Sequence, residues 1–175
     1  MDQLGGLMKT MPVTGRTFLV GSAAISGLPP FNGFVSEFLI YYAAFQGLNL
    51  QGPDFLLSMT AIISLALIGG LAAGCFTKAV GIVFLGEPRS EHAKTAKDAG
   101  PTMRAAMTTL ALACLLIGLW PEPFIRAAFA GLRDLSALAA IPADILGSVP
   151  RNLALVARVF VGLLLGLRGL RLLLC

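Results

Sequence analysis

Residues 26–38 have the sequence SGLPPFNGFVSEF, which places two prolines, an asparagine and two glycines between apolar flanks. The apolar region around this stretch runs from Thr17 to Gln46. A helix needs about 20 apolar residues to cross a bilayer, and neither flank, at roughly 17–28 and 34–46, is that long alone. The pattern therefore predicts one discontinuous transmembrane helix, interrupted at the segment LPPFNG, residues 28–33.

The composition is typical of an integral membrane protein. The 175 residues are 57% hydrophobic and only 13% charged, whereas about 25% of a soluble domain is charged. We therefore predict an all-α membrane bundle of about four transmembrane helices, the first of them discontinuous. The cysteines are far apart and lack metal-ligand spacing. With no flavin, nucleotide or nucleic-acid motif in the sequence, we expect no cofactor, no metal and no nucleic-acid partner.

Three further spans are predicted, at roughly 55–76, 105–120 and 152–174. A charged segment at 86–104 separates the first two. Residues 124–148 mix arginines and aspartates with alanines and leucines, which indicates an amphipathic helix lying at the membrane interface.

The basic residues fall unequally on the two sides of these spans. The N-terminal side of the first span holds Lys9, Arg16, Lys78, Arg89, Lys94, Lys97, Arg104, Arg168 and Arg171. The opposite side holds Arg126, Arg133 and Arg151. The positive-inside rule then predicts a multi-pass protein of the inner (plasma) membrane, with its N-terminus in the cytoplasm.

The interrupted helix is expected to expose polar backbone near the middle of the membrane. Pro29 and Pro30 have no N–H to donate. Asn32 is expected to cap the second half-helix, and Gly33 to permit a backbone conformation closed to bulkier residues. Broken backbone is tolerated in a membrane only when it is buried in protein or lines a hydrated cavity, and transporters use such half-helix ends to hold ions.

Glu37 follows the break by about one helical turn and is the only acidic residue between Asp2 and Asp54. A charge at that depth costs about 2.5–3.5 kcal/mol or more, and such residues usually face a bundle interior or a proton path. The position predicts a proton-relay carboxylate. The alternative is a structural role, in which Glu37 bonds the broken backbone or pairs with a lysine of another chain. Lys78 is a weaker candidate, for proton uptake; a lysine extending to the interface is the simpler interpretation.

Three separated segments together resemble a known family. They are DQLGGLMKTMPVTG (2–15), GSAAISGLPPFNGFVSEFLIYY (21–42) and FTKAVGIVFLGEPRS (76–90). They resemble the proton-translocating, antiporter-like membrane subunits of respiratory complex I, of Mrp cation/proton antiporters and of group 4 hydrogenases. GLPPFNGFVSE and FLGEPRS are most similar to the hydrogenase-4 component B and formate hydrogenlyase subunit 3 branch.

The resemblance implies specific roles for the residues of the break. In this family a discontinuous helix carries a lysine or glutamate just after its break, at the end of the proton route towards the outer face. Glu37 matches that position, and Pro29, Pro30, Asn32 and Gly33 match the break. The central lysines and histidines of the family lie on helices that would precede residue 1, so the resemblance implies a fragment or split subunit. Residues 1–120 would be the C-terminal part of the antiporter-like domain, and 121–175 an interfacial segment plus a final span.

The expected function is that of an outer-side proton half-channel. The chain would be a non-catalytic membrane subunit of an ion-translocating oxidoreductase complex, of the hydrogenase or NADH:quinone oxidoreductase type. Its expected partners are other membrane subunits, the lipid bilayer, and protons, or sodium in their place. Two alternatives stay open: a component of a cation/proton antiporter without a redox partner, and a structural membrane scaffold.

Overall fold

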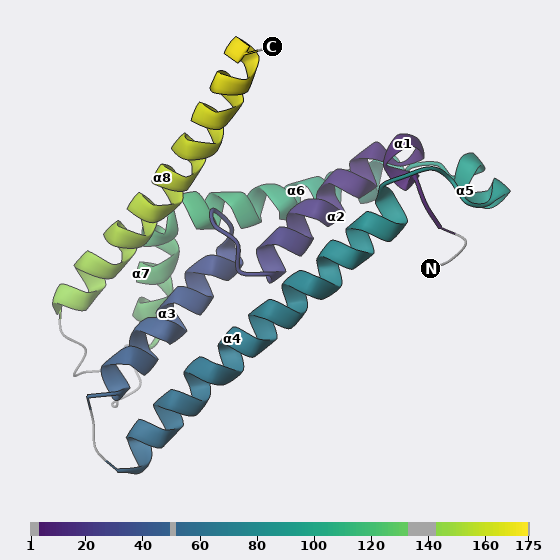
Figure 1. Cartoon of the computed structure of the whole chain (residues 1–175). Helices are drawn as coiled ribbons and strands as arrows, with labels where there is room; N and C mark the ends of the chain where they lie inside the picture. Colours follow the sequence, from purple (N-terminus) through teal and green to yellow (C-terminus); the bar gives the residue numbers. More distant parts are fainter. Residues whose placement is uncertain (1–3, 50–51, 133–142, 175) are drawn as a thin grey trace.

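The computed structural model describes residues 4–49, 52–132 and 143–174, and each secondary-structure element in these ranges is helical (Figure 1). The elements are α1 (Leu7–Thr10), α2 (Pro12–Ile25), α3 (Asn32–Gly47), α4 (Pro53–Ala79), the π-helical turn η1 (Val80–Phe84), α5 (Glu91–Thr95), α6 (Pro101–Leu119), α7 (Pro121–Leu132) and α8 (Ala143–Leu174). Within the described residues, three segments are long and apolar enough to cross a membrane: Pro53–Phe84, Pro101–Leu119 and Val149–Gly169. The predicted all-α membrane bundle is thus confirmed.

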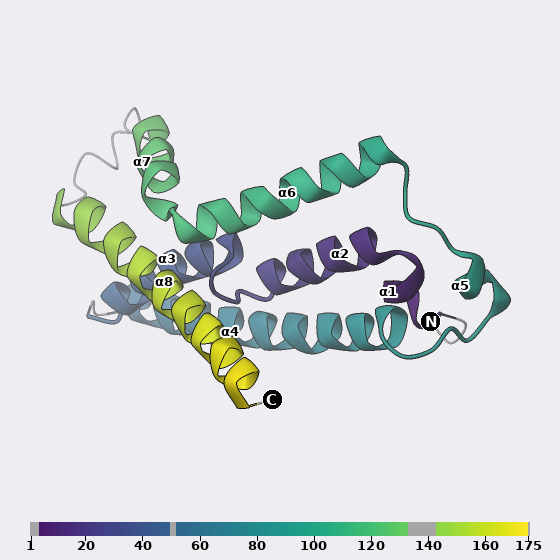
Figure 2. The same ribbon diagram turned by 90° about the horizontal axis from the view of Figure 1, so that it is seen from above.

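Helices α2 and α3 follow each other end to end beside the long helix α4. Figures 1 and 2 show α4 running antiparallel to both, with the gap between α2 and α3 opposite its middle. The two helices have 14 and 16 residues, each short of the length that a single crossing needs. Together they have the length and alignment of one interrupted span, with the interruption at residues 26–31.

Helix α4 presents apolar side chains around its whole circumference. It contains no buried residue, and Leu57 and Leu71 are 71% and 66% exposed. A helix that is apolar on every side is suited to a surrounding of lipid or further membrane helices, rather than water.

The C-terminal region differs from the sequence-based expectation. The last helix begins at Ala143, well before residue 152, and continues through Pro150, which is buried. The segment 124–148, expected to be amphipathic, falls on α7 as far as Leu132 and on the first residues of α8 from Ala143, and residues 133–142 lie outside the described part of the chain. A proline removes one helical hydrogen bond, and neighbouring helices in a bundle can tolerate that loss.

The principal apolar core joins α3, α7 and α8. Val35, Ile125 and Leu153 are buried together, one from each helix, and Leu153 is fully inaccessible. Partly buried side chains surround them: Phe34, Phe38, Leu39 and Phe129. This cluster holds the second half of the interrupted helix against the C-terminal part of the chain.

Candidate functional site

The interruption begins with a glycine that ends α2. Gly27 has φ +64°, the left-handed conformation that L side chains rarely adopt. Its N–H donates to the carbonyl of Ala24 at 3.3 Å, and the N–H of Leu28 donates to the carbonyl of Ala23 at 3.2 Å. This pair of bonds is the Schellman arrangement that satisfies the last carbonyls of a helix. The polar end of α2 is therefore closed by the chain's own backbone.

The chain then turns through Pro29 and Pro30, which are joined by a cis peptide bond. The N–H of Phe31 donates to the carbonyl of Leu28 at 3.1 Å, and α3 begins at the next residue, Asn32. The two prolines thus lie between the half-helices, and α3 starts without a side-chain cap.

Two glycines let the helices approach the break closely. A Cβ on Gly33 would collide with the carbonyl of Ala24, so the first turn of α3 rests directly on the last turn of α2. A Cβ on Gly118 of α6 would collide with the carbonyl of Pro30 and stand 2.8 Å from the carbonyl carbon of Phe31. The break is therefore packed among α2, α3 and α6 rather than left open.

Glu37 lies in α3 with its carboxylate against Gly27. A Cβ on Gly27 would stand 2.6 Å from the Cδ of Glu37. The side chain is half-buried and lines a groove of about 400 Å³, the Glu37 groove. The lining residues are Gly21, Ala24, Ile25, Asn32, Gly33, Ser36, Glu37 and Cys114. The arrangement brings a carboxylate, an amide and a hydroxyl to one surface depression beside the helix break.

Two sequence-based expectations about the break are wrong. Asn32 does not cap α3: it is the first residue of that helix, and its Oδ1 is buried without a hydrogen-bond partner. Gly33 does not have the special backbone conformation expected of it, since the positive φ belongs to Gly27. Gly27 ends the first half-helix, and Gly33 serves the close packing of α3 on α2.

The structure does not bring Lys78 to the Glu37 groove. Lys78 is exposed in the last turn of α4, immediately before η1. That end of α4 lies beside the start of α2, away from the break (Figure 1). A direct pairing of Lys78 with Glu37 within the chain is therefore absent from the described residues.

The end of the molecule away from the break is tied together by segments far apart in sequence. The N–H of Gly6 donates to the carbonyl of Leu85 at 3.0 Å, and Lys9 pairs with Glu87. Phe84 of η1 is buried with Leu7. The segments 2–15 and 76–90, which carry two of the three family motifs, thus contact each other where the structure describes them.

Asp98 caps α2 from the linker before α6. Its two carboxylate oxygens accept from the backbone N–H groups of Val13 and Thr14, each at 3.1 Å, and from the Thr14 hydroxyl at 2.8 Å. Partial burial acts to raise the pKa of Asp98, but these hydrogen bonds and the nearby Arg104 outweigh it and hold the pKa below its ordinary 3.8. A carboxylate at a helix N-terminus also suits the helix dipole.

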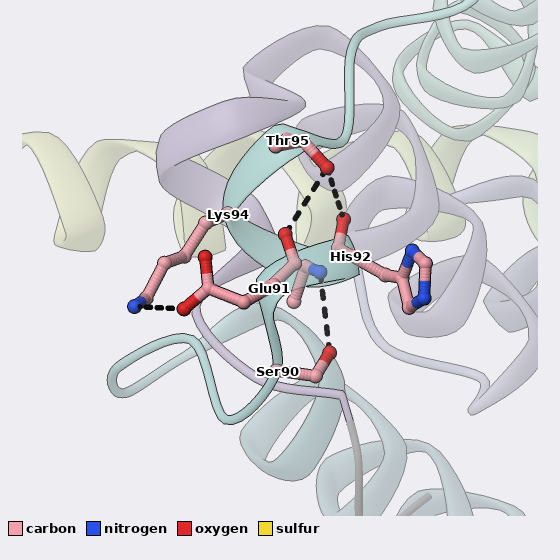
Figure 3. A network of polar contacts seen from close by, with 6 residues as sticks. Ser90, Glu91, His92, Lys94 and Thr95 are labelled. Carbon is pink, nitrogen blue, oxygen red and sulfur yellow. Dashed lines mark hydrogen bonds and ion pairs between the residues drawn. The ribbon is translucent and has the colours of Figure 1, made fainter.

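The short helix α5 in the same linker is held by its own side chains (Figure 3). The Ser90 hydroxyl accepts from the N–H of Ala93 at 3.2 Å, and Lys94 pairs with Glu91 at 2.7 Å. The ring of His92 points away from these contacts and is exposed. This segment is a capped surface turn, consistent with a loop role for the only histidine in the chain.

Long helices with apolar outer faces, beside an interrupted helix that carries an acidic residue, define an integral membrane protein. Residues 1–77 match the family described as NADH:quinone oxidoreductase/Mrp antiporter, transmembrane. The chain belongs to this family of membrane subunits, which the hydrogenases share with complex I.

The chain is also similar to named components of hydrogenase, formate hydrogenlyase and NADH-quinone oxidoreductase. The chain is 42% identical over 135 residues to hydrogenase-4 component B of Escherichia coli, covering 71% of this chain and 19% of the relative. It is 38% identical over 133 residues to formate hydrogenlyase subunit 3 of the same organism, covering 73% and 22%. It is 31% identical over 135 residues to an NADH-quinone oxidoreductase subunit of Geobacter metallireducens, covering 76% and 26%. The chain thus spans about a fifth to a quarter of the length of these relatives.

The sequence alone missed two residues that shape the break, Gly27 and Gly118, and the residue that caps the far end of α2, Asp98. Gly27 gave a weak signal, because it stands between a helix and two prolines, where a left-handed helix end is common. Gly118 and Asp98 gave none, since each acts on an element distant in sequence. Contacts of this kind become visible only when the helices are assembled.

Proposed function

We propose that the chain forms the outer-side proton half-channel of an antiporter-like membrane protein, with Glu37 as the proton-relay residue. The observation that carries the proposal is the position of the Glu37 carboxylate in a groove directly beside the helix break. The groove also brings the Asn32 and Ser36 side chains to the same surface as this carboxylate, and acidic residues inside membrane proteins commonly mark proton or ion paths.

In this proposal, residues 1–120 form the C-terminal part of an antiporter-like domain, and the remaining helices of the domain come from another part of the same protein or from another chain. The N-terminus lies in the cytoplasm, so α2 and α3 run outward and α4 returns. Redox chemistry takes place in partner subunits. It changes the electric field around Glu37, and the proton then leaves towards the outer face.

Two relatives favour a second candidate function, that of a cation/proton antiporter component without a redox partner. The chain is 33% identical over 131 residues to a protein of Rhizobium meliloti described as a probable K(+)/H(+) antiporter component. It is 32% identical over 125 residues to a Na(+)/H(+) antiporter component of Staphylococcus saprophyticus. Under this alternative, Glu37 is again the proton-relay residue, but a cation gradient drives proton transport.

Proton transport in inverted membrane vesicles tests the proposal and separates the candidates. The vesicles contain the chain with its partner subunits, and either a redox substrate or a sodium or potassium gradient drives transport. Transport that needs the redox substrate supports the first candidate, and transport driven by the cation gradient alone supports the second. Unchanged transport with Glu37→Gln would leave only a structural scaffold role for this chain.

A further inference from the structure

Arg158 lies near the middle of the last segment that is able to cross a membrane, Val149–Gly169. Because α8 already begins at Ala143, Arg158 stands further inside this span than a helix starting at residue 152 would place it. A charged side chain near the bilayer centre is costly, and such residues usually face protein or a water-filled cavity and pair with another group. Long basic side chains reach the interface only from positions near helix ends. Arg158 therefore needs a partner within the membrane.

The described part of this chain does not supply that partner. Arg158 is exposed and forms no ion pair with the residues that the structure describes. The preceding residue, Ala157, is fully buried, and Leu153 packs in the core shared with α3 and α7. Consecutive residues of a helix point about 100° apart, so Arg158 is turned away from this core and towards the outside of the bundle.

Arg158 belongs to an open face of α8, the Arg158 face, which also includes Gly162, Leu165 and Gly166. The spacings of four, seven and eight residues from Arg158 place these positions on one side of the helix. A Cβ on Gly162 or Gly166 would meet no atom within 4 Å, and Leu165 is 61% exposed. The C-terminal end of α8 extends beyond the other helices in Figures 1 and 2. Small residues four apart let a second membrane helix approach closely.

We propose that the Arg158 face binds a transmembrane helix of another subunit, and that this helix carries an aspartate or glutamate that pairs with Arg158. A carboxylate accepts two parallel hydrogen bonds from a guanidinium and balances its charge. A second copy of this chain fits the face less well, because two copies inserted in the same orientation would bring their Arg158 side chains together. Helix α8 also lies outside residues 1–77, which match the family, so it is available to a helix from outside the shared domain.

Photo-cross-linking in the assembled complex identifies the helix on this face. Benzoylphenylalanine takes the place of Leu165, and mass spectrometry identifies the cross-linked peptide. We expect a transmembrane helix of another subunit, with a carboxylate at the depth of Arg158. The matched control carries the probe in place of Leu167, which is 56% exposed and lies on the other side of α8, and it should not label that helix. Cross-links to a second copy of this chain, to lipid alone or to a helix without a carboxylate would overturn the proposal.

Retention of the cross-linked subunit during purification tests the charge pair. Removing one member of an interfacial charge pair leaves the other unpaired, so Arg158→Leu should lower retention by at least about tenfold, whereas Arg158→Lys keeps the charge and should retain more. If Arg158 faced lipid, leucine would remove a costly charge and the complex would hold together as well as the wild type or better. Arg168→Leu removes an exposed arginine near the end of the same span and should behave like the wild type.

A charge exchange tests the pairing itself. Arg158→Glu should release the subunit, and replacing the carboxylate of the cross-linked helix with arginine should restore its retention. Two single variants that each release the subunit, with no recovery when they are combined, would contradict the pair. Loss of the subunit with Asp134→Asn, as complete as with Arg158→Leu, would place the pair within this chain and also overturn the proposal. These readouts measure assembly rather than transport, so they hold whether or not Glu37 is a proton relay.

Discussion

The carboxylate of Glu37 occupies the space that a side chain on Gly27 would fill. The same glycine ends α2 in the left-handed conformation. Gly27 therefore both ends α2 and leaves room for the Glu37 carboxylate. The two half-helices contact each other at this glycine.

Replacing Gly27 should disturb Glu37 itself. We expect Gly27→Ala to add about 1–2 kcal/mol of backbone strain and to push the Glu37 carboxylate out of its position, so that proton transport falls. The matched control is Gly86→Ala, since Gly86 also has a positive φ but no atom within 4 Å of its would-be Cβ. If both variants lose transport equally, strain alone explains the effect and the contact with Glu37 is unimportant.

The close approach of α6 to the break predicts a packing defect. Gly118→Ala places a methyl group against the carbonyl of Pro30, and overpacking of this kind costs about 1–3 kcal/mol. We expect a lower thermal stability of the solubilised complex, measured as the fraction still assembled after heating. Gly74→Ala on α4 has open space around it and should have no such effect. Equal stability of the two variants would show that α6 does not approach the break this closely.

The Asp98 cap predicts an acid-sensitive contact. Because the pKa of Asp98 is lower in the folded protein than its ordinary value of 3.8, the carboxylate stabilises the fold fully above that value. This contribution is lost as the pH falls through the folded pKa. Asp98→Asn should therefore lower the melting temperature at neutral pH, and the difference from wild type should disappear as the pH is lowered below 3.8.

A second acidic residue in the same linker provides the control for Asp98. Glu91 forms only an exposed ion pair with Lys94, and such pairs contribute about 0–1 kcal/mol. Glu91→Gln should change the melting temperature little at any pH. An Asp98→Asn protein as stable as the Glu91→Gln protein at neutral pH would mean that α2 is not capped from the linker.

The packing of α8 on α3 and α7 can be tested at its most buried residue. Leu153 is fully inaccessible, whereas Leu155 in the same helix is 61% exposed. We expect Leu153→Ala to destabilise the assembled protein by about 2–5 kcal/mol, through lost transfer energy and a cavity, and Leu155→Ala to have a much smaller effect. The measurement is again the assembled fraction after heating, and a reversed order would show that α8 docks by another face.

The sequence predicts the all-α membrane architecture, because long apolar segments leave few other possibilities. It also predicts where the first span is interrupted, since Pro29 and Pro30 cannot continue a helix. The course of the last helix was predicted less well. Pro150 was expected to precede it, but the packing of Leu153 against α3 and α7 accompanies a helix that continues through the proline.

At the site, the sequence indicates which residues are polar but not what each one contacts. Asparagine often caps a helix, yet Asn32 is the first residue of α3, makes no cap and lines the Glu37 groove. The contacts of Gly118 and Asp98 join elements distant in the chain, and no local pattern marks them. The role of Glu37 as a proton relay stays a prediction.

The proposed function requires that Glu37 exchange a proton during transport. The most direct measurement is proton transport, at matched turnover, in vesicles containing the assembled complex with Glu37→Gln or Glu37→Asp. Glu87→Gln, which removes an exposed linker carboxylate paired with Lys9, is the control. We predict that the glutamine variant assembles but does not transport, that the aspartate variant transports in part, and that the control transports fully. Full transport by an assembled Glu37→Gln complex would show that Glu37 is not the proton relay.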